Sequence, residues 1–241
     1  MNVPLWLSSS LVLDARKALW FPRERTLAVA NLHLGWTPGE ESPATDETVA
    51  LLLALAADYQ PERVVLLGEL VHPRAPLPVT TERLRALLET LGERTGVVLL
   101  GDPADAAFDA RLREAGWEAG VVPHWQCGKH LLLHGACDME AGPAGAPREE
   151  GEEEEEGACR VIATENPGII LGEAAPVCCP CFLLAEGVLL LPAFSPWVTP
   201  LDFRRETWHT PALRDLEWKQ AVAIAAGKLL PMGLPPPRSL D

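Results

Sequence analysis

Short apolar runs recur along the chain, and each is bounded by Gly, Pro or a charged residue, which is typical of buried β-strands. The runs cover residues 11–13, 27–30, 64–67, 97–100, 131–133, 161–162, 169–171 and 188–191. Apolar residues with helical spacing lie between the early runs, over 46–59, 81–94 and 104–115. Strands and helices therefore alternate in the first half, whereas the part after Gly120 is mostly strand. This order predicts an α/β fold with a core between two sheets.

Two further segments define the expected domain organisation. Residues 138–157 lack apolar periodicity and include seven Glu between positions 149 and 156, so we expect a disordered surface insertion at about 138–158 within a single domain over 1–205. Apolar residues recur with helical spacing over 213–230, and Pro-rich sequence follows. We therefore expect 206–241 to form a C-terminal helix and a tail.

The charge of the chain limits its partners. It carries 34 acidic residues against 20 Lys and Arg, which gives a formal net charge of -14. Because phosphate backbones attract basic surfaces, we expect weak or no direct binding of nucleic acid, except through a local contact or a metal ion. The N-terminus lacks the basic start of a secretory signal, and the sequence contains no apolar run long enough to span a membrane. A cytoplasmic location without membrane contact is the expectation.

The six cysteines are then expected to be thiols rather than a disulfide framework. Cys178, Cys179 and Cys181 form a cluster for which the sequence leaves two alternatives, buried thiols or a zinc site. Buried thiols are favoured, because three cysteines within four residues of a strand cannot all face one ion.

Polar side chains gather where the predicted strands end. They are Asn31 and His33, Glu69 and His72, Asp102 and Asp105, His134, and Glu173. Because residues i and i+2 of an extended strand point to the same face, Asn31 and His33 are expected to lean together. One such residue would be a cap or a turn former, whereas a set at five successive strand ends indicates a functional site.

The order and spacing of these residues resemble the calcineurin-like metallophosphoesterases, and most of all a bacterial branch often encoded with DNA ligase or helicase partners. The matching segments are LWFP at 19–22, LAVANLHLG at 27–35, VLLGELVH at 65–72, GEAAP at 172–176, in place of the family's G-H-x-H-P, and LPAF at 191–194. The resemblance covers residues 11 to 203. It implies an α/β fold, a four-layer α/β/β/α sandwich of two mixed sheets flanked by helices.

The resemblance also implies a site for two divalent cations, in which this chain replaces several ligands. The first metal would be held by Asn31 in place of Asp, His33, the bridging Glu69, and Ala175 in place of His. Since an amide oxygen is a weak neutral ligand and Ala has none, this site is expected to be vestigial. Asp105 matches a structural position of the motif.

The second metal site retains more ligands by the same comparison. Glu69, Asp102, His134 and Glu173 would bind a single metal, and their carboxylate oxygens favour Mn or Mg. The alternative is that no metal binds at all. Pro103 stands where the family has a general-acid His, and proline cannot donate a proton. His72 is the candidate substitute for that His, and no residue is assigned a catalytic role.

Two functions follow from this resemblance. The first is a pseudoenzyme of the metallophosphoesterase fold that binds a protein partner, such as one acting in DNA repair. The second is an active metal-dependent phosphoesterase or phosphodiesterase, which hydrolyses DNA ends or a small phosphate ester. Whether the chain is an enzyme is left open by its sequence.

Overall fold

A computed structural model describes residues 3–35, 43–72, 77–101, 120–134, 158–205 and 210–234, with residues 110, 112–114, 116–118 and 208; at 43 and 77–79 only the backbone is described. Asp102, Pro103 and Asp105 lie outside these residues, as do most of the helix expected over 104–115 and nearly all of the expected insertion.

The first sheet has six strands in the order of the chain. They are β1 (Leu5–Ser8), β2 (Leu11–Asp14), β3 (Ala18–Phe21), β4 (Thr26–Ala30), β5 (Arg63–Leu67) and β6 (Gly96–Leu100). Strands β1 to β4 pair antiparallel, and β4, β5 and β6 pair in parallel. The parallel part needs crossover connections, which the two helices supply. The turns after β4 and β5 therefore lie at the same edge of the sheet.

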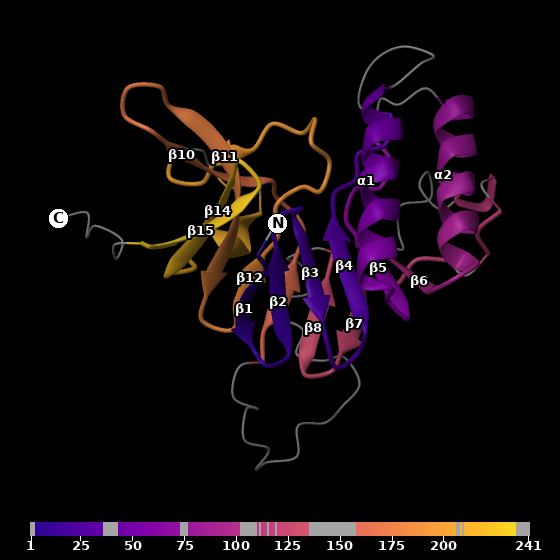
Figure 1. Cartoon of the computed structure of the whole chain (residues 1–241), viewed down its shortest axis with the longest axis horizontal. Coiled ribbons are helices and arrows are strands. Elements are labelled where there is room, and N and C mark those ends of the chain that lie inside the picture. Colours follow the sequence, from indigo (N-terminus) through magenta and orange to yellow (C-terminus); the bar gives the residue numbers. More distant parts are fainter. Residues whose placement is uncertain are drawn as a thin grey trace.

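Helices α1 (Pro43–Tyr59) and α2 (Leu77–Gly92) lie side by side over one face of this sheet (Figure 1). Leu52 and Leu55 of α1 and Leu84 of α2 pack with Val64 and Leu66 of β5 in one apolar cluster. The helices therefore bury the outer face of β4, β5 and β6. The apolar residues that recur with helical spacing in the sequence form the helix faces that pack on the sheet.

The second sheet has nine strands, with the main order β13-β10-β11-β12-β9-β8-β7. They are β7 (His124–Cys127), β8 (His130–Leu133), β9 (Arg160–Ile162), β10 (Pro167–Leu171), β11 (Val177–Ala185), β12 (Val188–Leu190), β13 (Leu201–Asp202), β14 (Gln220–Ala225) and β15 (Lys228–Gly233). The long strand β11 pairs with β10 through its first half and with β12 and β14 through its second half. Parallel and antiparallel pairs both occur, so this sheet is mixed as well.

The main core lies between the two sheets. Phe21 and Leu67 of the first sheet pack with Leu132, Phe182 and Val222 of the second in one buried cluster. The outer face of the second sheet is covered by irregular chain around the 3-10 turn η2 (Pro211–Leu213). The predicted sandwich of two mixed sheets with flanking helices is therefore confirmed. In the described part of the chain, the helices cover the first sheet and this irregular segment covers the second.

All eight predicted strands are present, but the predicted C-terminal helix is wrong. Residues within 206–241 instead form the hairpin of β14 and β15, and β14 pairs with β11 in the second sheet. In the described ranges no helix is both long and apolar enough to cross a membrane.

Candidate functional site

The turn that follows β4 begins the candidate site. Asn31 and His33 have left-handed backbones, with φ of +54° and +46°. Their predicted alternation on an extended strand is therefore wrong. Main-chain hydrogen bonds hold this turn beside the turn after β5, from the N–H of Asn31 to the carbonyl of Leu67 at 2.8 Å and from His33 to Glu69 at 3.0 Å. The pairing of two turns, not strand alternation, places Asn31 and His33 at one edge.

The Asn31 side chain uses both ends of its amide. Its Oδ1 accepts a hydrogen bond from the main-chain N–H of Glu69 at 3.2 Å. Its Nδ2 donates to Oδ1 of Asn166 at 3.0 Å and to the main-chain carbonyl of Glu165 at 3.4 Å. Asn31 is buried, so an amide without these partners would be costly. This side chain joins the first sheet to the segment before β10 in the second sheet.

Gly68 makes room for this arrangement. Its φ is +79°, and a Cβ atom at this position would lie 2.0 Å from Oδ1 of Asn31. Only glycine meets both requirements, the left-handed backbone and the close approach of the amide.

The Glu69 carboxylate contacts one imidazole at this edge, and two further imidazoles influence it. Nδ1 of His33 lies 3.0 Å from Oε2 of Glu69, and the His33 and His72 rings have centroids 6.0 Å apart. The pKa of Glu69 is held below its usual value, chiefly by the hydrogen bond from His33, against the opposing effect of partial burial. The neighbouring imidazoles of His33, His72 and His134 lower the pKa of Glu69 further by their electrostatic effect. The structure therefore places His33 against Glu69 and His72 beside His33, with His134 near enough to act on the carboxylate electrostatically.

Glu173 and Ala175 lie away from this group of side chains. Both are exposed in the turn between β10 and β11. Asn166, which contacts Asn31, immediately precedes the other end of β10. At a rise of about 3.3 Å per residue, the strand places Glu173 roughly 20 Å from that contact. The structure does not bring Glu173 or Ala175 to Asn31, which corrects the expected place of Glu173 among the metal ligands and of Ala175 in the vestigial site.

The sequence reasoning missed the segment that does reach the site, Thr164, Glu165 and Asn166. The Glu165 side chain is buried, and its Oε1 accepts a hydrogen bond from the main-chain N–H of Thr210 at 2.7 Å. The Oγ1 atom of Thr164 is buried without a hydrogen-bond partner among the described residues. The signal was available, because these polar residues follow the apolar residues 161–163.

The described residues do not fit the first metal. The amide of Asn31 is committed to hydrogen bonds with the protein, and Ala175 is remote as well as without a donor atom. Across the described ranges, no group of three or more His, Cys, Asp or Glu side chains is arranged to hold a metal ion. Asp102, the remaining expected ligand of the second metal, lies outside those ranges.

The cysteine cluster on β11 is divided between two faces of the strand. Cys179 and Cys181 are buried, and Cys178 lies on the other face, where its thiol donates to the carbonyl of Pro200 at 3.4 Å. Burial raises the pKa of Cys181. This geometry favours thiols over a shared zinc ion.

No protein-family profile matches the chain, and no curated protein matches it. A solved structure does: the crystal structure of the Pseudomonas putida nuclease MPE shares 25% sequence identity, with a TM-score of 0.62. The match covers 95% of this chain and 99% of the nuclease chain. The similarity to a nuclease over nearly the whole length is consistent with a phosphoesterase-type fold, and it includes both sheets that form the candidate site.

Proposed function

We propose that the chain is a calcineurin-like phosphoesterase-fold protein whose first metal site has been replaced by a hydrogen-bonded pair of amides. Its hydrolytic activity is lost or strongly reduced, and its function is to bind a partner. The second-sheet side of the former metal site is the segment from Thr164 to Asn166.

The contact between Asn31 and Asn166 carries this proposal. A carboxylate ligand accepts hydrogen bonds but donates none when ionised, whereas the Asn31 amide donates to Asn166 and accepts from Glu69. The donor and the acceptor of this amide therefore both have protein partners. Such a side chain stabilises the contact between the two sheets. A metal ligand would instead have to leave its oxygen atoms available to the ion.

The position of this contact also changes how the family motif matches the chain. In this proposal the G-H-x-H-P motif corresponds to ATENP at 163–167, which ends in the same proline and includes the Asn166 contact of Asn31. Thr164 and Asn166 then stand at the two histidine positions. This assignment replaces a nitrogen ligand at each position by a weaker neutral oxygen group, which supports loss of the first metal.

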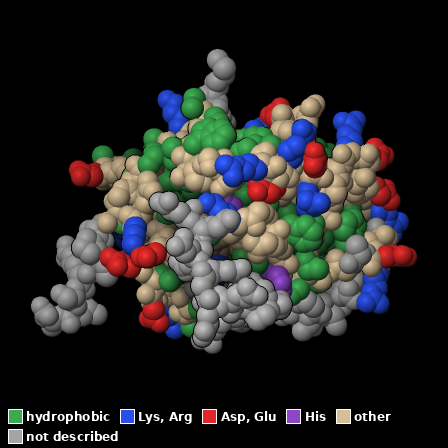
Figure 2. All heavy atoms as spheres, turned by 90° about the horizontal axis from the view of Figure 1, so that it is seen from below, with side chains coloured by type: hydrophobic (Ala, Val, Ile, Leu, Met, Phe, Trp, Pro, Cys, Tyr) green, Lys and Arg blue, Asp and Glu red, His purple; other side chains and the backbone are tan. Residues whose placement is uncertain are grey.

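A protein partner, such as a component of DNA repair, suits the surface better than a nucleic acid. The net charge is -14, and on the face seen in Figure 2 basic and acidic side chains are interspersed. Nucleic acids are usually bound by a continuous basic patch or stripe. We propose that at most one metal ion, Mn or Mg, binds, and that Glu69, His134 and Asp102 hold it weakly.

A second candidate function is an active metal-dependent phosphodiesterase that acts on DNA ends or on a small phosphate ester. Two observations favour it: the group formed by Glu69, His33, His72 and His134, and the similarity to a nuclease. In this case His72 would supply the proton that Pro103 cannot.

Hydrolysis of bis-p-nitrophenyl phosphate separates the two functions. The assay compares the wild type with Glu69→Ala and with the surface control Glu186→Ala. Each protein is tested with Mn, Mg, Zn, Ni and Co. The proposal expects no activity above that of Glu69→Ala with any metal. Activity that Glu69→Ala abolishes and Glu186→Ala retains would establish the second function instead.

A further inference from the structure

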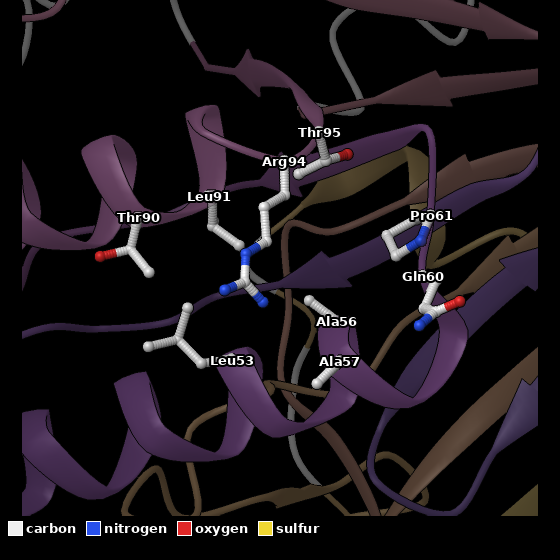
Figure 3. Close-up of a pocket in the computed structure, with 9 residues that line it drawn as sticks. All are labelled: Leu53, Ala56, Ala57, Gln60, Pro61, Thr90, Leu91, Arg94 and Thr95. Carbon is white, nitrogen blue, oxygen red and sulfur yellow. The ribbon is translucent and has the colours of Figure 1, made fainter.

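A pocket of about 460 Å³ opens between the C-terminal parts of α1 and α2 (Figure 3). Gln60 and Pro61, which line it, connect α1 to the beginning of β5. The candidate site lies at the other end of β5, after Leu67. The pocket is therefore separated from that site by the length of strand β5. Its volume falls within the range of roughly 300–1,000 Å³ that is typical of small-molecule sites.

Apolar side chains from both helices line part of the pocket. Leu53, Ala56 and Ala57 of α1 face Leu91 of α2 across it. Two threonines also line it, but the Thr90 hydroxyl donates to the carbonyl of Ala86 at 2.7 Å. The Thr95 hydroxyl donates to the carbonyl of Gly96 at 3.4 Å. The apolar part of a ligand in this pocket would therefore contact the methyl and methylene groups of these side chains.

One cation points into this apolar space. The guanidinium of Arg94 lies over the pocket between Leu53 and Leu91 in Figure 3. It forms no ion pair with the part of the chain that the structure describes, whereas two acids of the neighbouring segments are engaged elsewhere. Asp58 pairs with Arg16, and Glu62 pairs with Arg25. Arg94 is exposed, so its guanidinium is available to a ligand at the open side of the pocket, with the Gln60 side-chain amide at the rim.

We propose that this pocket binds a small organic anion, a carboxylate carried on an aliphatic chain or an aromatic ring. The carboxylate would accept a two-fold hydrogen bond from the Arg94 guanidinium, the geometry that Arg favours. The apolar body would displace water from Leu53, Ala56 and Leu91, which supplies the hydrophobic part of the affinity. This inference does not depend on whether the candidate site is active.

Calorimetric titration of the full chain with octanoate, phenylacetate and indole-3-acetate tests the proposal, with octanamide as the uncharged probe. At least one carboxylate is expected to bind saturably, and octanamide more weakly than octanoate. Arg94→Gln is expected to weaken binding about tenfold or more, because it removes a charged hydrogen-bonding partner. Ala57→Trp, at an exposed position of the rim, is expected to abolish binding by filling the pocket.

Lys228→Gln provides the matched control, since it removes one positive charge from the start of β15 in the other sheet. It is expected to leave the affinity unchanged, and circular dichroism confirms that every variant is folded. The proposal is overturned if none of the three carboxylates binds, if Arg94→Gln binds as well as the wild type, or if Lys228→Gln weakens binding equally.

Discussion

Nδ2 of Asn31 donates a hydrogen bond to Oδ1 of Asn166 at 3.0 Å, and this contact links the turn after β4 to the segment before β10. The two residues belong to different sheets and are separated by 135 positions in the sequence. The bond is directional, since Asn31 is the donor and Asn166 the acceptor. The two positions should therefore respond differently to the same substitution by Asp.

Asn31→Asp is expected to destabilise the protein by about 1–3 kcal/mol, because it removes the buried donor and places a carboxylate against two oxygen acceptors. Asn166→Asp keeps the acceptor that Asn31 uses, so its cost should be clearly smaller. Urea unfolding of both variants at pH 7 measures the difference. A larger loss at Asn166 would mean that the hydrogen bond runs in the other direction, and equal losses would mean that it does not determine stability.

Gly68→Ala is expected to cost more than strain alone, because its Cβ atom would meet Oδ1 of Asn31 at 2.0 Å. Gly187 is a matched control: its φ is +63°, and a Cβ atom added there meets nothing within 4 Å. Gly187→Ala should therefore report the cost of a left-handed alanine, about 1 kcal/mol. Thermal unfolding of the two variants gives the comparison, and similar melting temperatures would argue against the close approach of Asn31.

Restoration of metal ligands tests which segment belongs to the former metal site. The triple variant Asn31→Asp, Thr164→His and Asn166→His is expected to gain affinity for Mn²⁺, because it places one carboxylate and two imidazoles in one region. The alternative triple variant, Asn31→Asp, Glu173→His and Ala175→His, is expected to gain none, since the last two positions lie far from Asn31. Calorimetry with Mn²⁺ compares them. A gain only in the second variant would refute the assignment of 163–167.

Tyr59→Phe is expected to lower stability at pH 7 by about 1–3 kcal/mol, because the Tyr59 hydroxyl donates to Oδ2 of buried Asp14 at 2.7 Å. Burial alone would raise the pKa of Asp14, but hydrogen bonds from Arg16 and Tyr59 outweigh it and hold the pKa below its usual value. A depressed carboxyl pKa stabilises the fold above the unfolded pKa, and this contribution is lost as the pH falls through the folded value. The difference between wild type and variant should therefore shrink at pH 3 in urea titrations, and an unchanged difference would contradict it.

The sequence predicts the strands well where a run is bounded by breakers, as at Val64 to Leu67, but it misassigns the C-terminal hairpin. Ala221 to Ile224 are all buried, because β14 packs Val222 toward the inter-sheet core and Ala221 toward the outer cluster. A strand covered on both faces has a continuous apolar run, which periodicity cannot distinguish from a helix. The turn at Ala226 and Gly227, both left-handed, is the remaining local sign of a hairpin.

At the candidate site, the sequence identifies Asn31, His33 and Glu69, which the structure brings together, but places Glu173 wrongly. A glycine four residues before a proline, as at 172–176, resembles the family motif in letters alone. Which of two candidate segments reaches Asn31 depends on the direction of β10, and this is fixed by its pairing with β11 and β13. The direction of a strand in a mixed sheet is a long-range property that local spacing does not contain.

The most direct test of the replaced metal site is a calorimetric titration of Mn²⁺ into wild-type protein that has been purified with a chelator. Because the Asn31 amide is engaged by Glu69 and Asn166, the titration should show at most one weak binding event. Two saturable events of high affinity would show that both metal positions function, and would contradict the proposal that a pair of amides has replaced the first of them.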